Sequence, residues 1–238
     1  MIVSAMVQHG DMAAARSAKK TAATAGARRA EVRLPPLAPF GAGELEPEGD
    51  YDGLEFRDLD LAGQQAHSAR FLDCALYGCG LDDTRLTGAR FIDSVLSGIR
   101  GVGTDLARAS LRDVEVRDVR MGGVQLHGSV LERVLIKGGK IDYLNLREAE
   151  LRDVVFDGCV LSEPDFGGAT LVRVEFHGCE LRGADFTGAR MKDVDLRGAT
   201  LLDIARGVER LAGAVISPTQ LLDLAPAFAA QVGVRVEA

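Results

Sequence analysis

Hydrophobic side chains recur at every fifth position along most of this chain, starting shortly after residue 50. Neither the 3.6-residue period of an amphipathic helix nor the two-residue period of a strand fits for long. Every fifth residue from Phe56 to Leu201 gives thirty positions, and all except Ala66 and Gly101 hold Leu, Phe, Ile, Met or Val. Two residues earlier the chain is mostly small or β-branched, and two residues later it is most often Gly or Asp. The pattern predicts two inward positions and one bend per unit.

A backbone that bends once in every five residues cannot be a straight strand. Several bends close a coil, and stacked coils allow the N–H and C=O groups of neighbouring turns to pair at the ~4.8 Å spacing of β-strands. The five-residue period therefore predicts a β-solenoid whose core is made by the inward side chains.

The segment GADFTGARMKDVDLRGATLLD, which starts at Gly183, resembles the A-(D/N)-L-x-x signature of the pentapeptide-repeat family. The similarity covers roughly residues 54–205. It implies an all-β fold, a right-handed four-sided parallel β-helix (a pentapeptide-repeat solenoid) with four units per coil. Thirty units then form about 7–8 coils over residues 51–205, followed by a short helical C-terminal cap.

Four units per coil place residues 20 apart above one another, which predicts stacked phenylalanines. The expected pairs are Phe71 with Phe91, Phe156 with Phe176, and Phe166 with Phe186. Gly101 removes one large core side chain and adds backbone freedom, so we expect a kink or a weak coil near residues 98–104.

The two ends of the chain depart from the repeat. Residues 1–50 are expected to form a flexible Ala- and Arg-rich extension, with a Pro-rich linker over 34–50. In residues 206–238, Ser217 and Pro218 predict a helix start, and Pro226 is expected to interrupt the helix. This segment can cap the open end of the solenoid, and it can also pair two subunits, as in dimerising members of the family that it resembles. The candidate residues for both roles are Leu221, Leu222, Leu224 and Phe228.

The chain has 28 Lys plus Arg against 35 Asp plus Glu, a formal charge of −7. That balance excludes a direct nucleic-acid binder by bulk charge. Residues 1–50 contain equal numbers of basic and acidic side chains, so the whole net charge falls on the remainder. No apolar run approaches the roughly 18 residues of a membrane span, and the basic residues follow the apolar start instead of preceding it. We therefore expect a cytoplasmic protein without a membrane partner.

Candidate chemistry is sparse. The four cysteines all fall on the small inward position, where a thiol acts as a compact apolar residue, and the histidines that follow large inward residues are expected on the surface. No phosphate-binding loop, nucleophile elbow or zinc-protease motif is present in the sequence. The sequence thus predicts no enzyme, no cofactor and no metal site. The cysteines are Cys74, Cys79, Cys159 and Cys179, and the histidines are His67, His127 and His177.

Two outward columns are candidate contact surfaces. One corner of the coil repeats an acid every 20 residues, which either stabilises the turns or forms a partner-binding ridge. A second column is aliphatic and either contacts a partner or packs under the first 50 residues. The ridge is Asp73, Asp93, Asp113, Asp153 and Asp193, and the apolar strip is Val95, Leu135 and Val155.

These features favour a non-catalytic scaffold that binds another protein through the surface of an acidic rod. The family resemblance implies an alternative, because some members mimic duplex DNA, bind type II topoisomerases such as DNA gyrase and modulate quinolone sensitivity. The unbroken five-residue register leaves no long projecting loops, and arginines interrupt the acidic column, which makes a poorer phosphate mimic.

Overall fold

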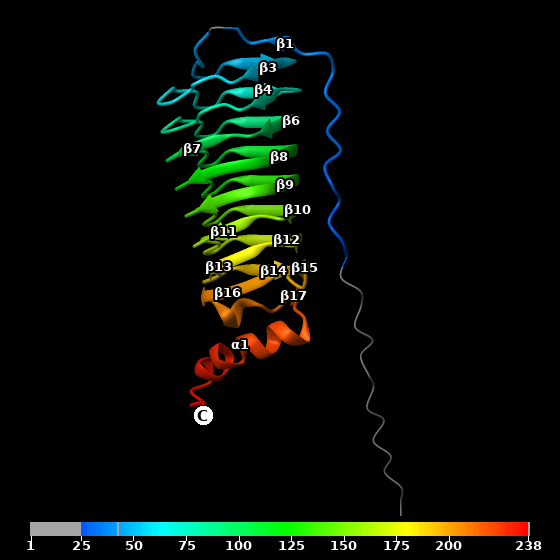
Figure 1. Cartoon of the computed structure of the whole chain (residues 1–238), viewed down its shortest axis with the longest axis vertical. Coiled ribbons are helices and arrows are strands. Elements are labelled where there is room, and N and C mark those ends of the chain that lie inside the picture. The colour runs from blue at the N-terminus through cyan, green and yellow to red at the C-terminus, as the bar shows by residue number, and fades with distance from the viewer. Residues whose placement is uncertain (1–24, 42, 238) are drawn as a thin grey trace, which may run out of the picture.

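The structure, a computed structural model, describes residues 25–41 and 43–237, and it is a parallel β-solenoid closed by one helix. Figure 1 shows the coils stacked along one axis, with helix α1 across the C-terminal end and an N-terminal segment along the outside. All of the paired strands run parallel and join into one sheet. The rod has about nine turns, against the 7–8 expected, because strands β1 and β17 extend it at both ends.

The strands follow the sides of the coil. They are β1 (Ala38–Pro39), β2 (Asp50–Asp52), β3 (Leu54–Arg57), β4 (Arg70–Leu72), β5 (Ala75–Tyr77), β6 (Arg90–Ser97), β7 (Arg100–Val102), β8 (Ser110–Gly122), β9 (Val130–Asp142), β10 (Glu150–Asp157), β11 (Val160–Ser162), β12 (Thr170–His177), β13 (Glu180–Asp185), β14 (Arg190–Lys192), β15 (Val194–Asp195), β16 (Leu201–Arg206) and β17 (Ala214–Val215). A 3-10 helix spans Val208–Arg210 and α1 spans Pro218–Gln231.

Strand register confirms the four-sided coil. Residues 20 apart are partners through most of the rod, as in the pairing of β10 with β12. Three sides of the coil are strands. The fourth is held by isolated bridges, such as Asp105 with Gln125 and Gln125 with Asn145. Four five-residue units therefore make one turn.

The predicted phenylalanine stacks are present in the core. The ring centroids of Phe71 and Phe91 are 4.5 Å apart, those of Phe156 and Phe176 4.8 Å, and those of Phe166 and Phe186 5.0 Å. All six rings are buried. Each stack adds about 0.5–1.5 kcal/mol beyond the burial of its rings.

Of the kink or weak coil expected near residues 98–104, the kink is wrong. β7 continues the ladder, and Gly101 pairs in register with Met121 of β8. The backbone at Gly101 lies close to the previous coil and takes up part of the space of the missing side chain. An added Cβ at Gly101 would lie 2.9 Å from the carbonyl carbon of Leu81. A cavity of about 60 Å³ lined by Leu81, Ile99 and Met121, among others, remains in the neighbouring core.

The five-residue register ends one unit earlier than the sequence suggests. Leu202, not Leu201, occupies the buried inward position and pairs with Leu181 of β13, a separation of 21 residues. The extra residue lies just before β16, where the Thr200 N–H donates to the Cys179 carbonyl. Both positions are Leu, so the sequence pattern could not show this shift.

The N-terminal end of the core is covered by the segment that the sequence presents as a linker. β1 pairs with β3, and the ring of Phe40 stacks on Phe56 with centroids 4.3 Å apart. Leu45 is buried in the core cluster, and Tyr51 continues the inward column one unit before Phe56. Residues 34–50 are therefore a docked cap in their described part.

The C-terminal end is covered by α1, which begins where the sequence predicts. Ser217 and Gln220 form a reciprocal capping box, and the Gln220 amide also donates to the carbonyls of Leu196 and Ala199 in the last coil. The expected interruption at Pro226 is wrong, because the helix runs through it to Gln231. Among the described residues, no helix is long and apolar enough to cross a membrane.

Candidate interaction surfaces

The predicted acidic ridge lies along one corner of the coil, between the first and second strand sides. Its five aspartates all adopt left-handed backbone conformations, with φ from +49° to +57°. Asp is one of the few residues with a side chain that tolerates this region, so the corner selects it for the turn. Arg133 and Arg173 occupy the same corner in two coils, with φ of +53° and +52°.

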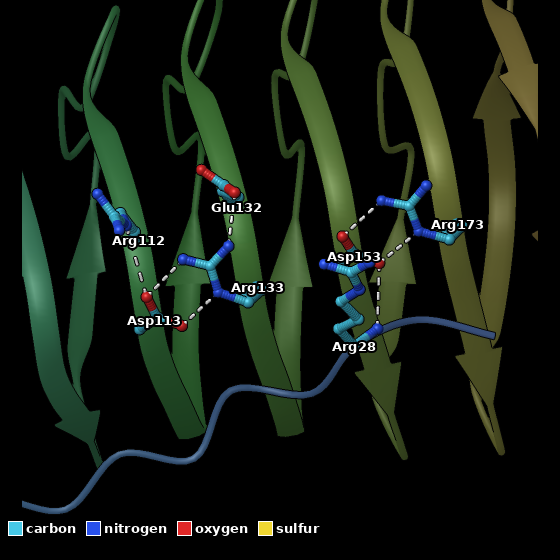
Figure 2. A network of polar contacts seen from close by, with 7 residues as sticks. All are labelled: Arg28, Arg112, Asp113, Glu132, Arg133, Asp153 and Arg173. Atoms are coloured by element: carbon cyan, nitrogen blue, oxygen red, sulfur yellow. Dashed lines mark hydrogen bonds and ion pairs between the residues drawn. The ribbon is translucent and has the colours of Figure 1, made fainter.

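Each of these two arginines binds the aspartate of the coil before it with both ends of its guanidinium group (Figure 2). Arg133 Nε lies 2.6 Å from Asp113 Oδ1 and Nη2 lies 2.7 Å from Oδ2, while Nη1 also reaches Glu132 at 2.5 Å. Arg173 holds Asp153 through contacts of 2.6 Å to both carboxylate oxygens. Two of the five ridge acids are therefore neutralised by bidentate pairs.

The aspartates of the ridge differ in burial and in the direction of their pKa shifts. The Asp153 side chain is only 3% exposed, and the Arg173 hydrogen bonds hold the pKa of that carboxyl below its ordinary value. Partial burial raises the pKa of Asp93, and the like charges of Asp113 and Asp73 raise it further. The column is a series of paired and unpaired acids, not a continuous acidic stripe.

An N-terminal strap, residues 25–37, lies along the outside of the rod (Figure 1), and its hydrogen bonds attach it to the second strand side and the adjoining corner. The Ala27 N–H donates to Glu175 Oε1 at 2.7 Å, and the Arg28 N–H donates to Asp153 Oδ1 at 3.1 Å. Ten residues later, Ala38 has reached the first coil and pairs with Leu54. That distance is about six strand spacings, roughly 29 Å, so the strap is close to fully extended.

The predicted apolar strip lies under this strap. Val155 is 1% exposed, Val95 is also buried and Leu135 is half-buried, although all three point outward from the coil. Val130 has the same outward position on the first side, where none of the described segments covers it, and is 44% exposed. Of the two interpretations drawn from the sequence, this burial favours packing under the N-terminal residues over contact with a partner. Glu175, which accepts the Ala27 N–H, occupies the next position of the same 20-residue column after Val155.

The four C-terminal candidates on helix α1 differ in exposure, and only Leu222 lies on the side directly away from the last coil. Leu224 is buried against the last coil and Phe228 is half-buried against the core, whereas Leu221 is 50% exposed and Leu222 is 75% exposed. The helix is thus a cap on one side and an apolar surface on the other.

A repeat profile described as "Pentapeptide repeat region" matches residues 69–146 and 144–205, more than half of the chain. The chain belongs to the pentapeptide repeat family. Proteins of this family are generally non-enzymatic.

Solved structures with a similar fold include HetL, a pentapeptide repeat protein involved in heterocyst differentiation regulation in the cyanobacterium Nostoc sp. strain PCC 7120. The two are 21% identical, with 74% of this chain and 93% of HetL covered and a TM-score of 0.39. Full-length QnrB1, a plasmid-mediated fluoroquinolone resistance protein, is 18% identical, with 78% of this chain and 100% of QnrB1 covered and a TM-score of 0.23. No curated protein sequence matches the chain.

The cysteines of this pentapeptide repeat are free and buried, at the small inward positions predicted. Cys74 Sγ lies 3.4 Å from the Tyr51 carbonyl and Cys79 Sγ lies 3.5 Å from the Phe56 carbonyl. Burial raises the pKa of both thiols, so they pack as apolar groups and offer no thiolate.

Histidine chemistry is equally limited. His177 Nε2 lies 2.7 Å from Glu175 Oε2, an acid that also binds the strap. In the described part of the repeat, no three His, Cys, Asp or Glu side chains are arranged to hold a metal ion. The sequence analysis did not predict the ion pairs of Arg133 with Asp113 and of Arg173 with Asp153, nor the path of the strap along the rod.

Proposed function

We propose that this pentapeptide repeat is a non-catalytic scaffold that binds another protein, with the exposed face of α1 as its principal contact. The observation that carries the proposal is the exposure of Leu222, on the side of α1 that faces away from the last coil, and of Leu221 at the edge of the docked side. The cap requires only one apolar side of α1. Two exposed leucines, one beside the docked stripe and one on the far side, are typical of a surface that is covered by a partner.

The rod supports this role because its interior is already filled by its own side chains. The inward columns form one continuous core from Leu45 to Leu224. Recognition therefore falls to the outer surface and the ends. The free, unbridged cysteines support a location in the cytoplasm, which we also propose.

Light scattering tests which protein covers α1. A twofold mass that falls to the monomer in a Leu221→Glu/Leu222→Glu variant identifies a second copy. A monomeric wild type directs the search to a different protein. A wild type that remains monomeric and retains no protein from its native cytoplasm overturns the scaffold.

A second candidate is a DNA mimic that binds a type II topoisomerase and modulates quinolone sensitivity. The net charge of −7, all of it on residues 51–238, favours this alternative, whereas the Arg133 and Arg173 pairs weaken it by interrupting the acids. Supercoiling by purified DNA gyrase is the test. Inhibition at micromolar protein in low salt that fades at physiological salt supports mimicry, and the absence of inhibition in both contradicts it.

A further inference from the structure

The third strand side of the rod carries three cationic side chains directly above one another. Arg100 of β7 pairs with Arg120 of β8, and Arg120 pairs with Lys140 of β9. Each is exposed, and successive coils place them about 4.8 Å apart along the axis. The same position holds Gly80 before them and Val160 after them, so this cationic ladder is confined to three coils.

The ladder borders a hollow of about 640 Å³, within the size range of small-molecule sites. The backbones of Gly101, Gly122 and Gly139 form part of its wall, and Val102 and Met121 supply apolar surface. An added Cβ at Gly101 would press on the Leu81 backbone. Gly101 and Gly139 take inward positions, so it is Gly122, next to the outward Val102 of the previous coil, that leaves the surface low between the cationic side chains.

The charges of the hollow leave two guanidinium groups without a carboxylate partner. Of the two acids in its lining, Asp142 pairs with Lys140 Nζ at 2.8 Å, whereas Asp82 Oδ1 accepts the Val102 N–H at 2.9 Å and keeps its negative charge. The lining therefore carries three cationic side chains against two carboxylates. Over residues 25–41 and 43–237, neither Arg100 nor Arg120 forms an ion pair. The fold thus places two unpaired arginines one coil apart, although the repulsion between their charges is unfavourable for the folded state.

We propose that this groove binds a small phosphate-bearing molecule, with Arg100 and Arg120 on the phosphate oxygens and Met121 and Val102 against its apolar body. A guanidinium group presents its N–H donors in a fork that matches phosphate oxygens. Two such groups one coil apart match a phosphate dianion better than they match a single carboxylate. Asp142, paired with Lys140, partly neutralises one end of the ladder. This favours one phosphate group over a longer polyanion.

Phenyl phosphate is the probe, titrated into the full chain at low salt and followed by calorimetry and backbone NMR. We expect saturable binding, with the largest shifts at residues 100–102 and 120–122, and weaker binding of inorganic phosphate because it lacks the apolar body. Arg100→Gln and Arg120→Gln should each weaken binding about tenfold or more. Arg90→Gln should leave it unchanged, because Arg90 has the same strand position on another side.

All three substitutions change exposed side chains, so circular dichroism should remain that of the wild type. Absence of saturation up to about 10 mM overturns the proposal. So does an equal loss in Arg90→Gln, or equal binding of phenol, which lacks the phosphate. Tighter binding of a hexaglutamate peptide than of phenyl phosphate would assign the groove to an acidic protein segment instead.

Discussion

Arg173 lies one coil above Asp153 and holds both of its carboxylate oxygens at 2.6 Å. The pair joins two coils of the rod at the corner where the N-terminal strap attaches, since the Arg28 N–H binds the same carboxylate (Figure 2). One aspartate thus ties together the corner turn, the next coil and the strap.

Arg173→Gln should lower the free energy of unfolding by about 2–3 kcal/mol, because it leaves a nearly buried carboxylate without its counter-charge. The matched control is Arg182→Gln, which breaks the exposed pair with Glu180 and should cost under about 1 kcal/mol. Urea unfolding at pH 7 measures both. Equal losses would contradict the role of burial.

The pH dependence of the same pair has a defined sign. The folded-state pKa of Asp153 is lowered by Arg173, so its contribution is complete above the unfolded value of about 3.9 and is lost as pH falls through the lower folded value. The difference between wild type and Arg173→Gln should therefore shrink below about pH 4. A difference that persists unchanged at pH 2 would assign the loss to packing.

Asp93→Asn should stabilise the protein at neutral pH by up to about 1 kcal/mol. The raised pKa of Asp93 means that its ionised form is disfavoured in the fold. The loss of stability caused by ionised Asp93 is therefore absent below its pKa in the unfolded state and complete above its higher pKa in the folded state. Asn is suited to the left-handed φ of +49°. Thermal unfolding at pH 7 and pH 3 should show the gain only at pH 7.

Asp118→Asn is the control for that experiment, because Asp118 adopts φ of +51° at a different corner. It separates the removal of a charge near Asp73 and Asp113 from the general change of Asp to Asn in this conformation. If both variants gain equally at pH 7, the like-charge account of the corner is wrong.

Val155→Asp should destabilise the protein by about 2 kcal/mol or more, whereas Val130→Asp should change the stability by no more than about 0.5 kcal/mol. The two valines share the outward position on neighbouring sides of the coil, but Val155 is 1% exposed and Val130 is 44% exposed. Equal effects would show that the strap does not cover its face in solution. Urea unfolding distinguishes the cases.

Leu224→Glu should lower the unfolding free energy by about 2–3 kcal/mol, because it places a charge against the last coil. Leu222→Glu should leave stability within about 0.5 kcal/mol, since that side chain is already in solvent. Thermal unfolding of the two variants tests whether α1 has one docked face and one free face. A large loss from Leu222→Glu would assign that face to folding.

The sequence predicts the solenoid well because each buried position is set by its own five-residue unit, and residues such as Phe71 and Phe91 then stack without long-range information. It fails where two local solutions are equivalent. Leu201 and Leu202 are equally apolar, so an inserted residue is invisible. Pro226 is tolerated because Leu224 before it and Phe228 after it both pack against the core and hold the helix on either side.

The candidate surfaces are less predictable because they depend on contacts between distant segments. The position of the strap is fixed by hydrogen bonds from Ala27 to Glu175 and from Arg28 to Asp153, 148 and 125 residues apart. Nothing periodic in the first 50 residues encodes those partners. The arginines of the acidic corner were visible in the 20-residue column, but their bidentate geometry requires the coil itself.

Affinity capture from a lysate of the native cells, quantified by mass spectrometry, tests the scaffold role most directly. Wild type, Leu221→Glu/Leu222→Glu and Val130→Glu should be compared at equal concentration, with the last variant adding one charge at an exposed site away from α1. We predict that wild type and Val130→Glu retain the same protein, and that the double variant loses it about tenfold or more. Equal retention by all three, or no specific protein retained by the wild type, would contradict recognition through α1.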